Sequence, residues 1–328
     1  MESYTGCRMV DNIVVFLMQL KGIGRKTIYR YFHLESGTYS LGDIRELLRE
    51  AASVTGKVRA PEMRELEKAY EEYKRTIEGS RAQGIRIITY LEPDFPVKLR
   101  GIDDPPAVIY TKGDIGCLNE KAVAVIGTRE PIEYGARVAE NLGYVLGRDG
   151  YTVVSGLAHG CDRSGHMGCL RAKGRTAAVM AGGLDRIYPS QHEELAREIV
   201  RAGGCLVSEY AVGVKASPGN FVERDRLQSG LSEGIIVVET AVKGGTWHTV
   251  AYAREYGRRI GCYVHPEKFI SREQVMGNQK LLKEAGTIGI GNDADLHEYR
   301  KLIDRKHEEL TRMDYVVMAQ PSFLVEIR

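Results

Sequence analysis

The hydrophobic pattern divides the chain into stretches with different periodicity. Up to about residue 80, apolar positions recur at helical spacing, as in residues 13–18 and within the charged segment 62–77, and no strand-like alternation occurs. Between these segments, Gly22-Ile23-Gly24 is typical of a tight turn between helices. The pattern therefore predicts a small helical domain over residues 1–80.

From residue 121 onward, short continuous apolar runs alternate with helical segments. The predicted strands cover residues 122–126, 151–154, 176–180, 205–207, 235–238 and 259–264, and the predicted helices lie near residues 133–148, 163–173, 191–202, 223–230 and 247–256. Continuous apolar strands separated by helices indicate a parallel sheet that is buried on both faces. Right-handed crossovers then give an α/β fold with a Rossmann-like, doubly wound, mostly parallel sheet.

The segment between these stretches contains one short apolar run at residues 85–90, which predicts a strand. Pro96, Pro105 and Pro106 then force an extended, irregular path. We therefore expect three parts, namely the helical domain at residues 1–80, the Rossmann-like domain at residues 81–295, and a short charged helical tail at residues 296–328.

The composition is that of an ordinary globular protein in water. Of the 328 residues, 46 are Lys or Arg and 44 are Asp or Glu, which gives a net charge of +2, and 43% are hydrophobic. No apolar run approaches the roughly 20 residues that span a bilayer, and the six scattered cysteines without a CxxC pair are typical of reduced thiols. We therefore expect a cytoplasmic protein with no membrane segment. The near-neutral charge excludes a polybasic coat, so any nucleic-acid binding has to come from a local patch.

Glycine, hydroxyl and basic residues follow several of the predicted strands. The set consists of Gly127, Thr128, Arg129, Ser155, Gly156, Gly182, Gly183, Lys243, Gly244, Gly245 and Thr246. The carboxyl ends of parallel strands meet at one edge of the sheet, where glycine allows close approach and helix N-termini favour anions. These positions predict a phosphate-binding pocket, with Arg129 as a planar donor. Neither GxGxxG after the first strand nor a P-loop occurs, which disfavours a nicotinamide dehydrogenase and a P-loop ATPase but leaves room for a mononucleotide.

A second cluster of aromatic and basic residues follows the loop at residues 211–220. Phe221 is followed by Arg224 and Arg226, which flank Asp225. In one interpretation a nucleobase stacks on Phe221 while the two arginines hold phosphates. In the other, a helix begins here, Phe221 belongs to the core, and the arginines form surface ion pairs. The segment alone favours neither interpretation.

Between about residues 94 and 286, a series of motifs follows in a fixed order. They read Asp94-Phe95-Pro96 with Leu99, Asp104-Pro105-Pro106, Ile126-Gly127-Thr128-Arg129 with Tyr134-Gly135, Ser155-Gly156-Leu157-Ala158-His159-Gly160-Cys161-Asp162 with His166, Gly182-Gly183-Leu184-Asp185 with Tyr188-Pro189, Ser208-Glu209-Tyr210, Phe221-Val222-Glu223-Arg224-Asp225-Arg226, Ser229-Gly230-Leu231-Ser232, and Gly277-Asn278 with Leu281-Leu282. In these motifs the chain resembles the DNA-processing protein A family (DprA, also called Smf). Residues 1–80 are similar to the family's sterile-alpha-motif or helix-hairpin-helix region only in their helices and glycine turn. That turn either binds a DNA phosphate through backbone N–H groups or only joins two helices.

The resemblance implies a cytoplasmic homodimer that binds single-stranded DNA. It implies that the protein loads the recombinase RecA, or protects incoming strands, in natural transformation or recombination, with no catalytic residue and no cofactor. Residue by residue, it implies phosphate contacts by Arg129, Arg224 and Arg226 and a nucleobase near Phe221. Ser155, Gly156, Gly182 and Gly183 would line the pocket through backbone groups, and the strand-end set adds Gly127, Thr128, Lys243 and Gly245.

The chain departs from the family pattern at positions that belong to the expected pocket. Thr128 stands in place of Ser, Asp225 in place of Asn, and Gly244-Gly245-Thr246-Trp247 in place of Ser-Gly-Ser-Leu. Asp225 puts a negative charge between two phosphate-binding candidates, which weakens or re-aims them. Trp247 is either an additional stacking platform or an obstruction. His265-Pro266 replaces Pro-Gly, and the C-terminal winged helix of many members is missing, so we expect a divergent member.

Other functions remain open from the sequence. A nucleotide-sensing or nucleotide-hydrolysing module would use Glu239 or Asp162 as its acid, although Asp162 also fits the N-cap of the helix predicted at residue 163. A regulator of the antitoxin or anti-phage kind would keep the fold and bind a protein partner. His159, Cys161 and His166 are spaced so that they do not share one face, which disfavours a metal site. The favoured hypothesis is therefore a single-stranded DNA-binding protein with no metal.

Overall fold

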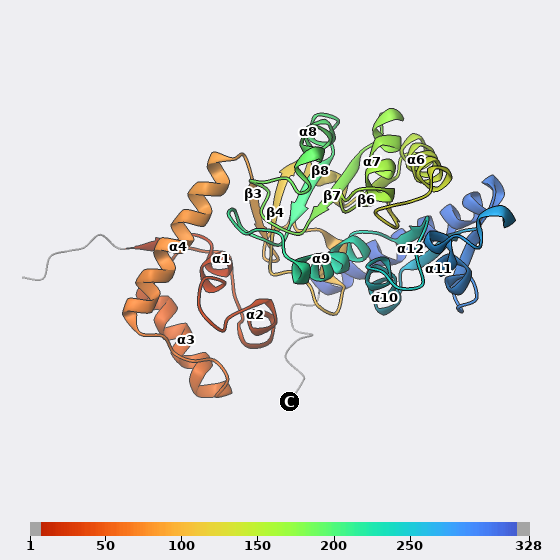
Figure 1. Cartoon of the computed structure of the whole chain (residues 1–328). Helices are drawn as coiled ribbons and strands as arrows, with labels where there is room; N and C mark the ends of the chain where they lie inside the picture. Colours follow the sequence, from red (N-terminus) through yellow and green to blue (C-terminus); the bar gives the residue numbers. More distant parts are fainter. Residues whose placement is uncertain (1–7, 320–328) are drawn as a thin grey trace, which may run out of the picture. The chain divides into compact units, whose positions relative to one another are not determined.

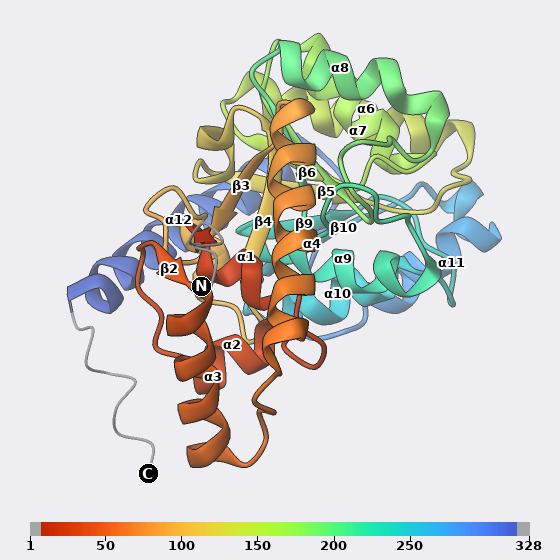
Figure 2. The same cartoon turned by 90° about the vertical axis from the view of Figure 1, so that its left-hand side faces the viewer.

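The computed structural model describes residues 8–319, with side chains through residue 312. The chain divides into two compact units. The residues up to Phe95 belong to the first unit together with Asp104–Tyr110, and Pro96–Asp103 belongs to the second unit together with the residues from Thr111 onward. Figures 1 and 2 show the helices and strands of these units from two sides.

The first unit is mainly helical. Its helices are α1 (Ile13–Leu17), α2 (Arg25–Tyr31), α3 (Leu41–Thr55) and α4 (Met63–Ala82), and its strands include β1 (Met9–Val10), β2 (Tyr39–Ser40) and β3 (Arg86–Thr89). Helix α3 begins at a capping box in which the Ser40 and Asp43 side chains each accept a hydrogen bond from the other residue's backbone N–H. Gly22, at φ +86°, makes the turn between α1 and α2 that its position predicts. The helical character of this region is confirmed, while the antiparallel pair of β1 and β2 is an element that the pattern does not predict.

The second unit is built on parallel strands. They are β5 (Ala122–Ile126), β6 (Thr152–Ser155), β7 (Thr176–Met180), β8 (Cys205–Ser208), β9 (Gly234–Val237), β10 (Arg259–Tyr263) and β11 (Thr287–Ile290), and the sheet also contains β3 and β4 (Val108–Gly113). The sheet has nine strands in the order β11-β10-β9-β5-β6-β7-β8-β4-β3. All pairings from β11 to β8 are parallel. The predicted Rossmann-like, mostly parallel sheet is confirmed.

The direction of strand order reverses between β5 and β9. From β5 the chain adds β6, β7 and β8 on one side, and it then returns to add β9, β10 and β11 on the other. At such a reversal the loops leave two neighbouring strands in opposite directions, which opens a crevice at the carboxyl edge of the sheet. The fold therefore provides its crevice between the residues that follow β5 and those that follow β9.

Helices cover the strands of the second unit. They are α5 (Val97–Arg100), α6 (Glu133–Arg148), α7 (Cys161–Arg171), α8 (Glu193–Arg201), α9 (Pro218–Gly230), α10 (Thr246–Glu255), α11 (Glu273–Leu281) and α12 (Asp293–Ala319). Helix α9 begins at Pro218 rather than at the predicted residue 223, because the Ser217 hydroxyl caps it by accepting from the Asn220 N–H at 3.3 Å. Helices α6 and α7 touch through glycine, since a Cβ on Gly168 would overlap the carbonyl oxygen of Glu140.

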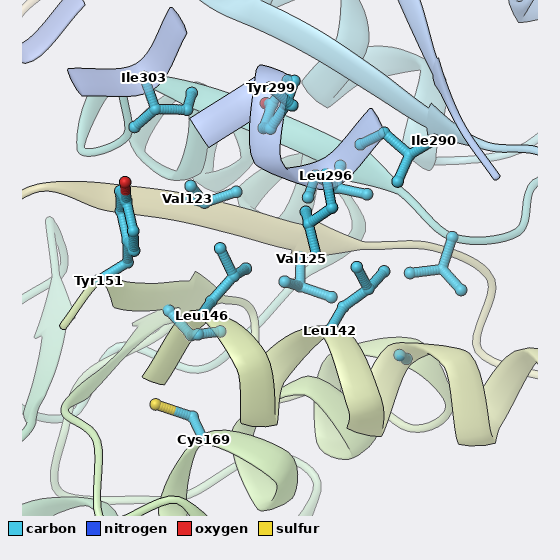
Figure 3. Close-up of a cluster of buried hydrophobic side chains, with 14 of the residues drawn as sticks. Val123, Val125, Leu142, Leu146, Tyr151, Cys169, Ile290, Leu296, Tyr299 and Ile303 are labelled. Carbon is cyan, nitrogen blue, oxygen red and sulfur yellow. The ribbon is translucent and has the colours of Figure 1, made fainter. Parts of the chain in front are cut away.

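A hydrophobic core lies between β5, α6 and α12 (Figure 3). Val123 and Val125 of β5 face Leu142 of α6, and Tyr299 and Ile303 of α12 complete the cluster. The Tyr299 hydroxyl is buried but satisfied, because it donates to the Ile235 carbonyl oxygen at 2.9 Å. The helix of the predicted tail thus contributes side chains to the core of the second unit.

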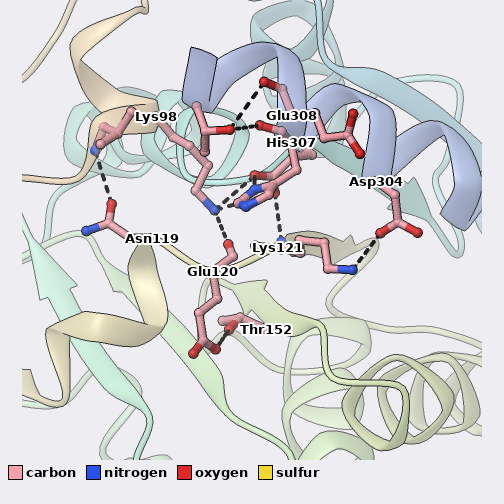
Figure 4. A network of polar contacts seen from close by, with 12 residues as sticks. Lys98, Asn119, Glu120, Lys121, Thr152, Asp304, His307 and Glu308 are labelled. Atoms are coloured by element: carbon pink, nitrogen blue, oxygen red, sulfur yellow. Dashed lines mark hydrogen bonds and ion pairs between the residues drawn. The ribbon is translucent and has the colours of Figure 1, made fainter. Parts of the chain in front are cut away.

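A buried ion-pair network lies at the opposite, amino edge of the sheet (Figure 4). Lys98 Nζ donates to the Glu120 carbonyl oxygen at 2.6 Å and lies 3.4 Å from the Glu233 carboxylate. Glu233 also accepts from the Ala122 N–H at 2.7 Å and lies 2.7 Å from His307 Nδ1. Burial acts to raise the pKa of Glu233, but Lys98 and His307 hold it below its ordinary value. The network ties α5 and α12 to the amino ends of β5 and β9.

Two further expectations concern membrane segments and cysteines. Over residues 8–319, no helix has the length and apolar character needed to cross a bilayer. Five of the six cysteines lie within the described residues, where they are buried and form no disulfide with one another. Cys7 lies outside that range.

Candidate functional site

A cavity of about 460 Å³ opens at the reversal point of the sheet, and we call it the main hollow. Its walls are formed by residues that follow β5 and β9, by residues along α9, and by the first turns of α7 and α10. These residues include Gly127, Thr128, Arg129, Asp162, Phe221, Val222, Arg224, Asp225, Gln228, Lys243, Gly244, Gly245, Thr246, His248 and Thr249. The structure thus brings together seven of the twelve predicted positions, namely Gly127, Thr128, Arg129, Phe221, Arg224, Lys243 and Gly245. The other five are the residues after β6 and β7 and Arg226 of α9.

The floor of the main hollow is fixed backbone. The Thr128 N–H donates to the Glu239 carbonyl oxygen at 2.8 Å, and the Cys161 N–H donates to the Thr128 carbonyl oxygen at 3.2 Å. A Cβ on Gly127 would lie 2.5 Å from the Cys161 sulfur. Glycine is therefore required at position 127 for β5 and α7 to approach each other, and the loop after β5 is held in place before any ligand arrives.

An arginine and an aromatic ring meet at the mouth of the main hollow. The exposed Arg129 guanidinium lies 5.1 Å from the centre of the Phe221 ring, and the Arg224 guanidinium lies 5.9 Å from it. Phe221 is only partly buried because it lies in the first turn of α9. The interpretation that places Phe221 in the core is therefore wrong, and its ring is part of the wall of the cavity.

Arg224 is a buried cation whose hydrogen bonds are incomplete. Its exposed fraction is 4%, and its Nε lies 3.6 Å from the Asp225 carboxylate and has no hydrogen-bond partner among the described residues. When the Gln228 amide is oriented to suit its neighbours, its oxygen accepts from Arg224 and, at 3.0 Å, from the Gly156 N–H. Arg224 therefore does not form the surface ion pair of the second interpretation, and its charge faces the main hollow.

The carboxyl groups of the main hollow have raised pKa values. Burial raises the pKa of Asp225 to about 7, Arg224 and Arg129 act to lower it, and Asp162 raises it further. Burial also raises the pKa of Asp162, against the opposing charge of Arg224. Asp162 is not the N-cap of α7, because the helix begins at Cys161. Its carboxylate accepts from the Gly156 N–H at 3.0 Å and so holds the loop after β6.

The predicted residues after β6 and β7 lie next to the main hollow rather than in it. Ser155 is buried, and its hydroxyl donates to the Val125 carbonyl oxygen at 2.7 Å. Gly156 and Gly182 line a second cavity, described below, and the Gly183 N–H donates to the Val214 carbonyl oxygen at 2.8 Å. The amides of Gly156 and Gly183 therefore already have protein acceptors, and phosphate binding through these backbone groups stays a prediction.

Arg226 has a structural environment that differs from that of Arg224. It is 1% exposed, it forms an ion pair with Glu209, and its Nε lies 3.7 Å from the Glu223 carboxylate. It does not belong to the walls of the main hollow. Its predicted phosphate contact is untested, while its observed role is to neutralise Glu209 beneath α9.

One of the two acids considered for nucleotide hydrolysis is buried inside the protein. Glu239 is unexposed, and its carboxylate lies 3.1 Å from His265 Nε2 and accepts from the Ile132 N–H at 3.0 Å. A Cβ on Gly135 would overlap this carboxylate. Glu239 does not line the main hollow. Its hydrogen bond with Ile132 holds the loop before α6 against the end of β9.

The histidine and cysteine residues near β6 are separated by their packing. His166 Nδ1 lies 2.6 Å from the Thr176 hydroxyl, and His159 packs against the ring of His192. Burial raises the pKa of the Cys161 thiol well above its ordinary value. Among the residues that the structure describes, no group of three or more His, Cys, Asp or Glu side chains could hold a metal ion.

Trp247 neither lines nor blocks the main hollow. Its indole N–H donates to the Ala241 carbonyl oxygen at 2.9 Å, and Lys280 lies 4.9 Å from its ring. The neighbouring His248 faces the cavity instead. Sequence reasoning missed His248, although the turn from Gly244 into α10 is the signal that would have placed it near the strand end.

Comparisons with known proteins show which family the chain resembles. The sequence model of the family described as DNA recombination-mediator protein A matches residues 86–299. The chain is 39% identical to DNA processing protein DprA of Bacillus subtilis over 60% of this chain and 66% of that protein. It is 38% identical to Protein Smf of Synechocystis over 56% and 47% of the two chains, and 36% identical to Protein Smf of Escherichia coli over 51% and 44%. The matched part thus spans less than two thirds of the length of each of these relatives.

Two solved structures are similar to this one. DNA processing protein A from Streptococcus pneumoniae matches with a TM-score of 0.64 and 26% identity, over 79% of this chain and 86% of that chain. DNA processing protein A from Helicobacter pylori matches with a TM-score of 0.58 and 26% identity, over 67% and 96% of the two chains. The Helicobacter structure is described as giving insight into the single-stranded DNA binding mode of that protein.

Proposed function

The chain belongs to the family of DNA recombination-mediator protein A, and from that premise we propose that it binds single-stranded DNA at the main hollow. The single observation that carries the proposal is the exposed Arg129 guanidinium, which lies 5.1 Å from the centre of the Phe221 ring at the carboxyl edge of the sheet. A nucleobase has a flat face that suits an aromatic ring, and a phosphodiester suits a guanidinium. The site thus offers both parts of a nucleotide a partner of the right chemistry.

The balance of charge in the main hollow supports an anionic ligand. Among the described residues, no carboxylate lies within ion-pair distance of Arg129 or Lys243, both of which are exposed. The buried Nε of Arg224 also has no hydrogen-bond partner there. An incoming phosphate would therefore meet two cations, Arg129 and Lys243, that form no ion pair with a described carboxylate. It would also meet Arg224, whose charge is partly balanced by Asp225.

Binding is tested by the fluorescence anisotropy of a labelled, unstructured oligothymidine at several salt concentrations. We expect a Kd of about 1–100 μM or tighter at low salt, weakening as salt is added because counterions are released. Arg129→Ala should remove most of the binding and reduce the slope of log K against log salt by about 0.7, which is the share of one phosphate contact.

The matched control is Arg201→Ala. Arg201 is also an exposed arginine, but it lies in the last turn of α8, and the last turns of the crossover helices are at the amino edge of the sheet. It should leave both the affinity and the salt slope unchanged. Unchanged anisotropy of the wild-type protein at low salt would refute the proposal.

The proposal extends to the role of the bound strand. We infer that a cytoplasmic homodimer of the protein delivers the strand to a RecA-type recombinase, which the description of the family as a recombination mediator supports. The test is whether the protein shortens the lag of RecA assembly on a strand that is already covered by a single-strand-binding protein. The mass of the free protein in solution tests the homodimer.

The size of the main hollow supports a second candidate, a site for one mononucleotide. Cavities of about 300–1,000 Å³ hold small ligands, and the walls include the carboxyl groups of Asp162 and Asp225. A panel of nucleotides would then raise the Tm, or release free base, in the absence of any polymer. If no nucleotide of the panel raises the Tm or releases free base, the mononucleotide hypothesis is rejected and single-stranded DNA stays the proposed ligand.

A further inference from the structure

A second hollow lies at the carboxyl ends of β6 and β7, beside the main one. It has a volume of about 290 Å³, and its walls include Gly156, Gly182, Arg186, Tyr188, Lys215 and Phe221. Phe221 is also a wall of the main hollow, so the two cavities meet at its ring. Because typical small-molecule sites start at about 300 Å³, the second hollow suits one planar group rather than a larger ligand.

The aromatic wall of the second hollow is open to solvent. Tyr188 is 54% exposed, and its ring centre lies 5.6 Å from that of Phe221 with the ring planes at 56°. Val214, in the same cavity, is 42% exposed. Since two tilted rings do not cover each other's faces, the face of Tyr188 can accept a further flat group.

The second hollow is preformed, because the loop that forms one wall is fixed to β7. A Cβ on Gly182 would lie 2.9 Å from the Ala216 backbone nitrogen, so only glycine allows the loop to pass this closely. The Gly183 N–H donates to the Val214 carbonyl oxygen at 2.8 Å, and the Gly213 N–H donates to the Asp185 carboxylate at 2.9 Å. Binding there would not require the loop to be ordered first.

The rim of the second hollow is positively charged. Arg186 and Lys215 are both exposed and both line it. The carboxylate nearest to Arg186 is that of Asp185, at 3.9 Å, and this carboxylate is already used by the Gly213 N–H. The combination of aromatic wall and cationic rim matches the two chemical parts of a nucleotide.

We propose that the second hollow binds an unpaired nucleobase of the same DNA strand, next to the base held in the main hollow. The inference rests on the proposed function. Tyr188 would stack on this second base, Arg186 and Lys215 would face its phosphate, and the ring of Phe221 would separate the two bases. A base in a duplex is stacked and paired and cannot enter such a cavity without being extruded, so two adjacent base sites select single strands.

The experiment compares the oligothymidine affinity of Tyr188→Ala with that of the wild type over a range of salt concentrations. Loss of a stacking ring should weaken binding about fivefold or more. The slope of log K against log salt should stay unchanged, because stacking releases no counterions, in contrast to the reduced slope of Arg129→Ala. Tyr188→Phe should restore the affinity, since it keeps the ring.

The control for loss of any tyrosine is Tyr144→Ala. Tyr144 also carries a cation over its ring, with the Arg171 guanidinium at 5.0 Å, but it lies on α6 and lines neither hollow. As a second measurement, an oligonucleotide containing 5-iodouracil is irradiated in the complex. The cross-linked peptide should contain Tyr188.

The outcomes separate this inference from the proposed function. If Tyr188→Ala binds with wild-type affinity, or shows a reduced salt slope, the proposed second base site is refuted. Binding at the main hollow is not affected by either result. Cross-linking only to peptides outside the second hollow would also refute the second base site. If the wild-type protein does not bind the oligonucleotide at all, the proposed function fails and the second site fails with it.

Discussion

We expect the carboxyl group of Asp225 to make the proposed strand binding sensitive to pH near neutrality. It is 14% exposed, it lies 3.6 Å from Arg224 Nε, and burial raises its pKa to about 7. With that pKa, the group is about 10% ionised at pH 6 and about 90% ionised at pH 8. Its negative charge therefore appears in the main hollow as the pH rises, and Asp225→Asn removes it with almost no change of shape.

The size of the effect follows from the repulsion between this carboxylate and a bound phosphate. At a separation of ~6 Å and an effective dielectric constant of about 20, two like charges repel by about 2.8 kcal/mol, or about two pKa units. The bound strand would raise the pKa of Asp225 by up to that amount, so that binding takes up a proton above pH 7. The affinity should then fall by at most about tenfold per pH unit, and by about 100-fold at most between pH 6 and pH 9.

The assay is the anisotropy titration at pH 6, 7, 8 and 9 and constant ionic strength, with the wild type and Asp225→Asn side by side. The wild type should lose affinity as the pH rises, and the variant should lose much less. Equal pH dependence of the wild type and Asp225→Asn, or tighter wild-type binding at higher pH, would refute the reasoning.

Folding supplies an independent check of the same carboxyl group. Because the pKa of Asp225 is raised in the folded state, ionisation of this group costs stability, and that cost grows as the pH rises from the ordinary value of an aspartate to about 7. Asp225→Asn should therefore have a Tm at pH 8 at least equal to that of the wild type. A lower Tm would mean that the carboxylate contributes favourable contacts that outweigh its burial.

Two further substitutions test the two edges of the sheet. Gly156→Ala would place a Cβ on the Arg224 guanidinium and should lose most of the strand binding measured by anisotropy, whereas Gly219→Ala, which meets no atom within 4 Å, should keep it. Glu233→Gln leaves the buried lysine of the amino-edge network without its charged partner and should cost about 3–5 kcal/mol of folding free energy in a denaturant titration. Glu298→Gln, on an exposed position of α12, is its control, and equal stability of the two variants would contradict the assigned role of the network.

The sheet was predictable where apolar residues run continuously. Residues 122–126 and 176–180 match β5 and β7 at both ends, because every residue of these strands is buried and the signal is uniform. β11 was not predictable in this way. Its sequence at Thr287–Ile290 contains a glycine and is only partly buried at the edge of the sheet, so its four residues carry little periodic signal.

The sequence predicts which residues of the site follow the strands, but not how each side chain is used. The fold class places residues after β5 and β9 together, and so Arg129 and Lys243 meet in one cavity. The different roles of Arg224 and Arg226 could not be predicted. They depend on which side of α9 faces the sheet and on the ion pair between Arg226 and Glu209, which a helical pattern does not specify.

The two edges of the sheet hold their buried carboxyl groups in different ways. At the amino edge, Glu233 is surrounded by a lysine, a histidine and a backbone N–H, and its pKa is lowered, which marks a charge that the protein itself satisfies. At the carboxyl edge, the pKa of Asp225 is raised and the Nε of Arg224 is buried without a hydrogen-bond partner among the described residues. A buried cation that is not fully satisfied costs free energy in the unbound protein. A phosphate bound at the carboxyl edge, as proposed, would recover part of that cost, because the arginine donor is already in place before the ligand arrives.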